Sequence, residues 1–279
     1  MDNIPADNAS SNTLIPRAVL HSALKIENLN VCHINVQSLV ARNFTKFHEL
    51  KANLIDNKVD IICFTESWLS DTINDIMIHL DGFRLVRNDR NRHGGGICVY
   101  LRNSLSFRTI AKSRSSSSDF NGTEYLVIEI TVSNIKLGLG VYYNPPNIDC
   151  SDTLASHLTE LTVKYDSTFF IGDFNTDLLK LSSRSRNLSE LFAATSYICV
   201  NSEPTFFHRS GCSLLDLLVT DSPDMVAKFD QLSMPGISNH DMIFCSIKYA
   251  ATLSNDTSDY RDYVNFDTVK LSNAFHCVN

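Results

Sequence analysis

The chain has 279 residues, of which 43% are hydrophobic and 20% are charged, and its formal net charge is -7. This composition is ordinary for a globular protein and supplies enough apolar residues for one large domain or two small ones. The negative charge excludes binding of a nucleic acid by global attraction, so local basic patches or a metal ion would have to meet such a partner.

The cysteines and the N-terminal sequence indicate the compartment. The eight cysteines form no CxxC pair, and several lie inside apolar runs such as IICF and IFCSI. This pattern favours buried free thiols in a reducing compartment over a disulfide framework or a zinc site. The first residues, MDNIPADNASSNTLIP, lack a basic stretch followed by an apolar run, and no later run approaches the ~20 apolar residues of a membrane helix. We therefore expect an intracellular protein.

Composition divides the chain into three parts. Residues 1–27 are rich in Asn, Ser and Ala, and we expect a disordered N-terminal extension there. Residues 28–249 alternate short apolar runs with helical patterns and form the predicted domain. The pattern then fades, so residues 250–279 are predicted to be a linker-like C-terminal tail.

Within the predicted domain, apolar runs indicate strands. In chain order they are LNVCHIN (29–35), IICFTE (61–66), GICVYL (96–101), YLVIEI (125–130), IKLGLGVYY (135–143), TFFIGD (168–173), LLDLLVT (214–220) and IFCSI (243–247). Residues 43–57 carry apolar side chains on one helical face, and Ser151 or Asp152 is expected to cap a second helix. The segments 88–96 and 113–122 are predicted loops because of their glycines and serines. This order predicts an α/β protein with two sheets packed face to face.

Polar residues recur where these apolar runs begin or end. Asn35 follows VCHI, Glu66 follows IICFT, Asp173 and Asn175 follow FFIG, and His240 precedes MIFCSI. Any one of them alone is most simply a turn residue. Five at corresponding places predict a shared site.

Asp216 is a further candidate because it lies inside the apolar run LLDLLV. An unpaired carboxylate buried there would cost several kcal/mol, so it needs a partner such as a histidine. A carboxylate–histidine pair with a second carboxylate and amides nearby suits hydrolysis of a phosphodiester. Glu66 would hold a hard divalent cation, and His240 would take a proton from water or polarise the phosphate.

Six segments together resemble the exonuclease-endonuclease-phosphatase superfamily over residues 28–249. They are HINVQSL, FTESWL, GVYYNPP, FIGDFNTDL, LLDLLVT and ISNHDMI. RNDRNRHGGGICVYLRN and EPTFFHRSGCSLLDLLVTD are similar to segments of its apurinic-type endonuclease branch, found in non-LTR retrotransposons. The resemblance implies a DNase I-like fold, a four-layer α/β sandwich of two packed mixed sheets with outer helices.

The resemblance also implies a role for each matched residue. These roles are metal and phosphate contact for Asn35, metal binding for Glu66, contact with the scissile phosphate for Tyr143, the GDxN pair for Asp173 and Asn175, orientation of the histidine for Asp216, and catalysis for His240.

The chain departs from the family pattern next to this histidine. The family usually has aspartate immediately before it, and this chain has Asn239. Asparagine keeps the hydrogen bonding and loses a charge, so we interpret Asn239 as a metal or phosphate contact of reduced strength. Gln37 and Pro146 also stand where related enzymes often have an acid and an asparagine, respectively.

The segment NDRNRHGGG allows two interpretations. Its glycines resemble a phosphate cradle, but GK[ST] is missing and a strand follows, so a flexible hairpin is favoured. Arg90 and Arg92 within it are predicted to contact a DNA backbone. Trp68 is interpreted as a core residue rather than a stacking platform, and His33 as a histidine without motif context.

The resemblance implies a Mg²⁺-dependent DNA endonuclease, with Mn²⁺ as a second usable cation. It would nick one strand and leave a 3′-hydroxyl for target-primed reverse transcription, with DNA and the RNA of the same element as partners, in the nucleus and without a membrane. The tail SDYRDYVNFDTVKL is similar to the start of the linker before a reverse transcriptase, which suggests an endonuclease fragment or a truncated element copy. Two alternatives stay open: a catalytically weakened nuclease-like module that binds nucleic acid or protein, and a phosphatase of the same superfamily.

Overall fold

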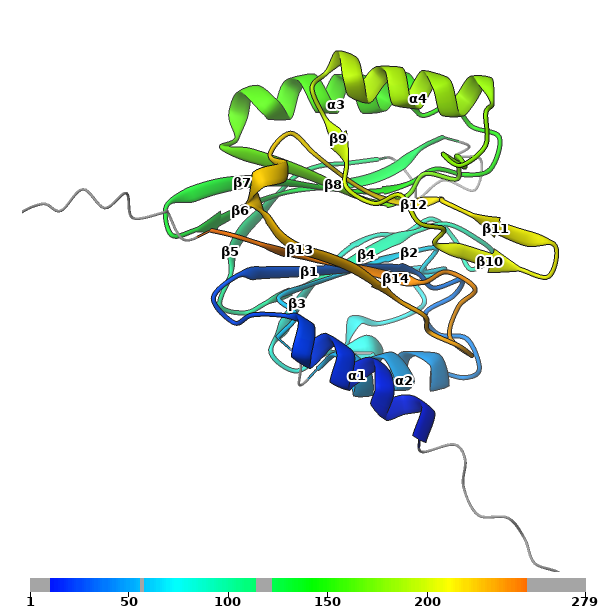
Figure 1. Cartoon of the computed structure of the whole chain (residues 1–279). Coiled ribbons are helices and arrows are strands. Elements are labelled where there is room, and N and C mark those ends of the chain that lie inside the picture. Colours follow the sequence, from blue (N-terminus) through cyan, green and yellow to red (C-terminus); the bar gives the residue numbers. More distant parts are fainter. Residues whose placement is uncertain (1–10, 56–57, 114–121, 250–279) are drawn as a thin grey trace, which may run out of the picture. The chain divides into compact units, whose positions relative to one another are not determined.

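The computed structural model of the chain describes residues 11–55, 58–113 and 122–249. They form two six-stranded sheets that face each other, with helices on both outer sides (Figure 1). The predicted four-layer sandwich of two mixed sheets is confirmed.

Both sheets have one parallel pair of strands at the centre and antiparallel neighbours. The strands of the first sheet are β1 (Leu29–Asn35), β2 (Ile61–Thr65), β3 (Phe83–Asn88), β4 (Ile97–Arg102), β13 (Val226–Leu232) and β14 (Met242–Ile247). The strands of the second sheet are β5 (Ser106–Lys112), β6 (Glu124–Val132), β7 (Ile135–Tyr143), β8 (Ser167–Asp173), β9 (Ile198–Cys199) and β12 (Asp216–Thr220). Their spatial orders are β13-β14-β1-β2-β4-β3 and β5-β6-β7-β8-β12-β9. The parallel pairs are β1 with β2 and β7 with β8.

Among the described residues, four α-helices cover the outer faces, two on each sheet (Figure 1). They are α1 (Ser11–Ala23) and α2 (Thr45–Leu54) on the first sheet, and α3 (Ser151–Lys164) and α4 (Ser183–Ala194) on the second. Buried side chains form three clusters: one under each helical layer and one between the sheets. A hairpin of β10 (Phe206–His208) and β11 (Gly211–Ser213) extends beside β12, and the 3-10 turns η1 (Asp75–Ile78) and η2 (Pro223–Met225) complete the described elements.

All eight predicted strands are present, and the missed ones are mainly edge strands. β3, β5 and β13 lie at sheet edges and carry partly exposed, mixed sequences such as VAKFDQL, so they show no apolar run. The helix predicted over residues 43–57 is α2, which begins only at Thr45 because Phe44 has a left-handed backbone (φ +67°). The helix α3 begins at Ser151. The amide of Ser151 donates a hydrogen bond at 2.9 Å to the side chain of Asp149, which lies before the helix.

The expected disordered extension is wrong for part of its length. Residues 11–23 form α1, and Leu20 and Leu24, four residues apart on one helical face, are fully buried in the core beside α2. Burial of these leucines supplies stabilisation that the polar composition did not suggest. Residues 1–10, the tail 250–279 and most of the predicted serine-rich loop lie outside the described residues, so the domain boundaries at 28 and 249 stay predictions.

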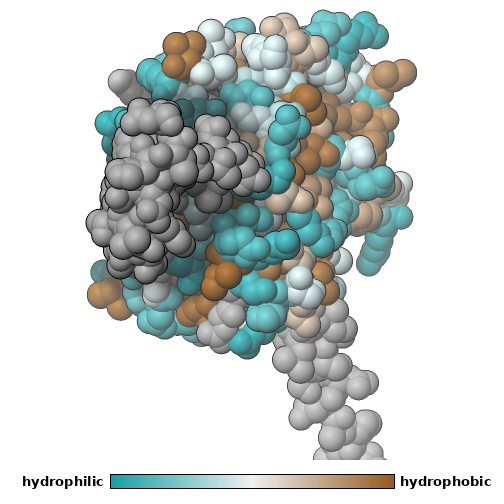
Figure 2. Space-filling model, turned by 60° about the vertical axis from the view of Figure 1, so that its left-hand side comes forward, coloured by the Kyte–Doolittle hydropathy of each residue, from teal (hydrophilic) through white to brown (hydrophobic). Residues whose placement is uncertain are grey.

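The surface combines hydrophilic and hydrophobic side chains. On the face seen in Figure 2 the two kinds occur side by side in small groups, as expected because apolar atoms contribute more than half of a folded protein's surface. Seven cysteines among the described residues are free, and five of them are buried. Within the described part of the chain, no helix has the length and apolar character needed to cross a membrane.

Candidate active site

Strand direction gathers the predicted polar residues at one edge of the sandwich. The parallel strands β1, β2, β7 and β8 all end there, and the antiparallel strands β12 and β14 begin there. The register pairs Tyr143 with Asp173, and Asp173 with Asp216, while Asn35 is paired with Thr65 immediately before Glu66. Residues from six strands therefore meet although they are spread over two hundred positions of sequence.

His240 and Asp216 form a buried hydrogen-bonded pair at this edge. The His240 Nδ1 atom lies 2.8 Å from Asp216 Oδ2, and the Thr205 hydroxyl donates to the same carboxylate oxygen at 2.8 Å. Burial alone would lower the pKa of His240, but the Asp216 carboxylate, helped by Asp173 and Glu66, raises it to about 9. His240 is thus held as an imidazolium near neutral pH, with Nε2 as the ring nitrogen that can meet a substrate.

Asp173 is fully buried and held by amides. Its Oδ1 accepts from the Asn175 backbone amide at 2.8 Å, and its Oδ2 accepts from the Asn35 side chain at 2.7 Å and the Asn175 side chain at 3.3 Å. Burial, and after it the neighbouring Asp216 charge, raises the pKa of Asp173 to about 7. A carboxyl group with this pKa can gain or lose a proton near neutral pH.

Glu66 is oriented by three side chains. Asn35 Nδ2 donates to Glu66 Oε1 at 3.2 Å, Trp68 Nε1 donates to Oε2 at 3.2 Å, and the Tyr143 hydroxyl also bonds to this carboxylate. Burial, followed by the charges of Glu66 and Asp173, raises the pKa of Tyr143, so its hydroxyl stays a neutral donor. Trp68 is half-buried beside Glu66, so the interpretation of Trp68 as a core residue is wrong.

The two tyrosines of YYNPP face opposite sides of β7, as alternation predicts. Tyr143 points into the space between the sheets, and Tyr142 packs under the helices against Phe174. Of the two tyrosines, Tyr143 is therefore the one that fits the predicted contact with a phosphate.

The remaining predicted residues lie around this cluster. Asn239 is exposed, directly before buried His240, and its backbone carbonyl accepts from Phe207 of the hairpin at 2.9 Å. Arg92 is exposed and donates to the Trp68 carbonyl at 3.0 Å. Arg90 is paired with buried Glu124, with 2.9 Å between Nη1 and Oε1. The predicted contacts of these three residues with metal, phosphate or DNA stay predictions.

Three residues of the site were missed by the sequence analysis: Thr205, Glu124 and His33. His33 is fully buried, its Nε2 lies 3.0 Å from the Thr65 hydroxyl, and its Nδ1 lies 3.7 Å from Asp216 Oδ1. A signal existed, because His33 precedes Asn35 by two residues and must share its face of the strand. Thr205 and Glu124 carry no comparable signal, since their contacts come from distant segments.

The residues at this edge fit a hard divalent cation. The carboxylates of Asp173 and Asp216 have ligand atoms within 4.8 Å of each other and of the His240 ring, which as an imidazolium lies beside a cation without binding it, and the carboxylate of Glu66 is joined to Asp173 through Asn35. Asp216 Oδ1 is buried and has no hydrogen-bond partner among the described residues. Carboxylate and amide oxygens are the ligands preferred by Mg²⁺ and Mn²⁺.

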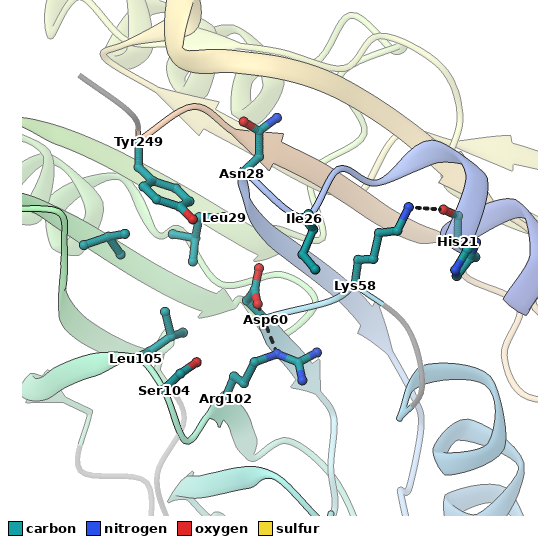
Figure 3. A pocket seen from close by; sticks show the side chains of 11 residues that line it. His21, Ile26, Asn28, Leu29, Lys58, Asp60, Arg102, Ser104, Leu105 and Tyr249 are labelled. Atoms are coloured by element: carbon teal, nitrogen blue, oxygen red, sulfur yellow. Dashed lines mark hydrogen bonds and ion pairs between the residues drawn. The ribbon is translucent and has the colours of Figure 1, made fainter. Parts of the chain in front are cut away.

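A separate cavity of about 610 Å³ lies at the opposite edge of the sandwich, where β1 begins and β14 has ended (Figure 3). Its charged groups are already engaged: Lys58 donates to the carbonyls of His21 and Leu24, and Asp60 pairs with Arg102 at 3.1 Å. We therefore take the polar edge, and not this cavity, as the candidate active site.

Comparison with known proteins links part of this chain to a family of nucleases. Residues 139–244 match the family described as endonuclease-reverse transcriptase, a stretch that runs from β7 to β14 and contains Tyr143, Asp173, Asp216 and His240. The predicted resemblance to the exonuclease-endonuclease-phosphatase superfamily is confirmed. No curated protein matches the chain.

Solved structures share the fold at low sequence identity. An AP endonuclease from Leishmania major has a TM-score of 0.64 at 14% identity, covering 80% of this chain and 88% of its own. The endonuclease domain of TRAS1, a telomere-specific non-LTR retrotransposon, has a TM-score of 0.59 at 14% identity, covering 80% and 100%. The 3′ phosphatase NExo from Neisseria, bound to a product DNA hairpin, has a TM-score of 0.57 at 14% identity, covering 79% and 100%. The chain thus has the nuclease and phosphatase fold of this superfamily.

Proposed function

We propose that the chain is a metal-dependent phosphodiesterase that cuts one strand of DNA. The observation that carries the proposal is the meeting of the His240–Asp216 pair with Asp173 and Glu66 at one sheet edge. An acid–base pair, a carboxyl group poised near neutral pH and a metal-binding carboxylate are the groups that phosphodiester hydrolysis requires.

Glu66 and Asn35 are the residues that we propose to hold Mg²⁺ or Mn²⁺, with the buried carboxylates beside them. A bound divalent cation supplies positive charge that stabilises the phosphate oxygens as charge develops on them. Asn35 donates to both Glu66 and Asp173, so it holds the two carboxylates side by side without adding a charge. Asn175, two residues after Asp173 at the end of β8, also donates to Asp173, from its backbone amide and its side chain.

The raised pKa values support the proposed roles. His240, with a pKa of about 9, donates a hydrogen bond from Nε2 to a non-bridging phosphate oxygen, and the neutral Tyr143 hydroxyl donates a second one. Asp173, with a pKa of about 7, takes a proton from the attacking water. The water oxygen bonds to phosphorus, and the bond to the 3′-oxygen breaks with its electron pair on that oxygen, which then takes up a proton from solvent, while Asp173 returns its proton to solvent.

The proposed substrate is DNA, and the proposed role is to nick it for reverse transcription. The match to the endonuclease-reverse transcriptase family and the structural likeness to the TRAS1 domain support nicking of DNA for reverse transcription of a retrotransposon. DNA would then be the main partner, the RNA of the same element a second one, and the nucleus the place of action.

A labelled duplex oligonucleotide tests this proposal. We expect the purified protein to cut one strand with Mg²⁺ and to leave it intact with EDTA. The product should be extended by a DNA polymerase without further treatment, because the proposed cleavage leaves a 3′-hydroxyl. A folded protein that cuts neither strand, or a product that cannot be extended, would contradict the proposal.

A phosphatase is the second candidate, because the structurally similar NExo is a 3′ phosphatase bound to product DNA. Release of inorganic phosphate from a 3′-phosphorylated DNA hairpin, and from phosphoinositides, separates the candidates. Phosphate release without cleavage of the unmodified duplex would favour the phosphatase.

A further inference from the structure

Glu124 is a buried acidic residue that the proposed chemistry does not use. It is the first residue of β6, fully buried, and lies opposite Tyr143 in the β6–β7 register. Its Oε2 accepts from the Gly96 amide at 2.6 Å, and its Oε1 lies 2.9 Å from Arg90 Nη1. A buried ion pair adds little to stability compared with apolar packing, so its presence suggests a role in fixing a geometry.

The three glycines of NDRNRHGGG wrap around this ion pair. A Cβ atom on Gly95 would lie 2.2 Å from Glu124 Oε1 and 2.4 Å from Arg90 Cζ, and Gly95 has φ +62°. On Gly94, a Cβ atom would lie 2.6 Å from Arg90 Nη2, and the Gly94 carbonyl accepts from Arg90 Nε at 3.0 Å. The glycines therefore form a cradle, and its occupant is the ion pair of the chain itself.

The cradle holds the backbone that follows Glu66. The carbonyls of Gly96 and Gly95 accept from the amides of Ser67 and Trp68, each at 3.0 Å. Glu66 and Trp68 both have a left-handed backbone, with φ +49° and +52°, which needs support from the surroundings. Glu124 thus connects to the metal-binding loop through a short series of backbone hydrogen bonds.

The ion pair also contacts the residue on the other side of Glu66. The Arg90 guanidinium lies over the Tyr143 ring, 5.8 Å from its centroid, and the Tyr143 hydroxyl bonds to Glu66. The Arg90–Glu124 pair therefore supports both the backbone from Glu66 to Trp68 and the ring of Tyr143. We infer that Arg90 and Glu124 are positioning residues, which hold Glu66 and Tyr143 in place for a divalent cation and a phosphate. This inference rests on the proposed function for its purpose, and on the contacts above for its structure.

The single tryptophan of the chain provides a readout that needs no activity. Trp68 is the only tryptophan, and its Nε1 bonds to Glu66 at 3.2 Å, so Mn²⁺ bound at Glu66 should quench its fluorescence. The experiment titrates Mn²⁺ into the wild type, Glu124→Gln, Arg90→Met and Glu66→Gln. Circular dichroism and thermal melting confirm that each variant is folded.

We expect Glu124→Gln and Arg90→Met each to raise the Mn²⁺ midpoint by about 10- to 100-fold, the usual effect of losing a residue that orients a metal ligand. The matched control is the pair of exposed Arg108 and partly buried Glu129, 2.8 Å apart on β5 and β6, whose variants Arg108→Met and Glu129→Gln should leave the midpoint unchanged. Using two separate variants keeps the test decisive if one of them does not fold.

Midpoints within twofold of the wild type in a folded Glu124→Gln or Arg90→Met protein would overturn the inference. Absence of quenching in the wild type would also overturn it, since no cation would then bind at Glu66. If the midpoints shift as expected but the wild type cuts no DNA, the positioning role holds and the proposed function fails.

Discussion

Asp216 lies between two histidines, and the surroundings give each histidine a different protonation. His240 bonds to Asp216 Oδ2 and has its pKa raised to about 9, whereas burial lowers the pKa of His33 to about 4 despite the nearby Asp216 charge. His33 is therefore neutral at physiological pH. Its Nδ1 faces the second oxygen of Asp216, so a proton on Nδ1 would help to hold the carboxylate in one orientation.

The neutral state of His33 should make stability depend on pH. A histidine whose pKa is lowered on folding contributes stability that is present above its unfolded pKa of about 6.5 and is lost as the pH falls towards 4. Between pH 7 and pH 4 this loss amounts to about 3 kcal/mol in the free energy of unfolding. Urea unfolding of His33→Gln should therefore show a shallower pH dependence than the wild type. The exposed His48→Gln serves as control, and equal slopes for wild type and His33→Gln would refute the assignment.

Asn239 is the position where added charge should strengthen the site. It is exposed beside His240, so an aspartate there would add a carboxylate to the site without a large desolvation cost. We expect Asn239→Asp to lower the Mn²⁺ midpoint several-fold and to increase nicking. Tryptophan quenching and plasmid assays measure the two effects. If the wild type does not nick and Asn239→Asp does, the binding-module interpretation holds for the natural chain. An unchanged midpoint would show that residue 239 does not contact the metal.

Which site residues the sequence could predict depends on where their partners lie. Asn35, Glu66, Asp173 and His240 stand beside the ends of apolar runs, so they could be found from local pattern alone. The buried Asp216 required a partner for energetic reasons. Glu124 could not be found from the sequence. It begins β6 in the second sheet, whereas its partners Arg90 and Gly96 precede β4 in the first sheet, so they meet only when the two sheets pack together.

At the scale of elements, the glycine segment combines a predicted turn with contacts that the sequence did not indicate. Its glycines favoured a hairpin over a phosphate cradle, and an antiparallel bridge between Asn91 and Gly94 closes a turn there, while the buried Gly95 and Gly96 contact Arg90 and Glu124. The sequence could not show these contacts, because Glu124 lies 28 residues beyond Gly96. Edge strands such as β13 were missed for a related reason, since they are recognised by their neighbours more than by their own residues.

Substitution of Gly95 measures the importance of this segment. The Cβ atom of Gly95→Ala would overlap Glu124 and Arg90 at a positive φ, so we expect the free energy of unfolding to fall by about 3 kcal/mol or more. Gly236→Ala is the matched control, because Gly236 also has a positive φ (+79°) but has open space around its Cβ position. There the cost should be about 1 kcal/mol. Equal losses in the two variants, measured by urea unfolding, would show that the ion pair adapts freely.

At the scale of the whole molecule, strand direction explains why one edge carries the chemistry. Two parallel pairs end at the same edge, and the antiparallel strands β12 and β14 begin there with Asp216 and, two residues before β14, His240. The presence of eight of the strands and the face-to-face packing of two sheets could be predicted from apolar runs. The contribution of α1 was missed because the polar residues 1–13 dominated the interpretation, although the stretch LIPRAVLHSAL at residues 14–24 is rich in apolar residues and contains the buried Leu20 and Leu24.

The central claim is that this edge is a metal-dependent phosphodiesterase site in which His240 acts on the phosphate. Nicking of supercoiled plasmid by the wild type and His240→Ala, each with Mg²⁺ and with EDTA, tests it most directly. We expect nicking that requires Mg²⁺ and falls by about 10²-fold or more in folded His240→Ala. Nicking that persists in EDTA, or that proceeds at the wild-type rate in His240→Ala, would contradict it.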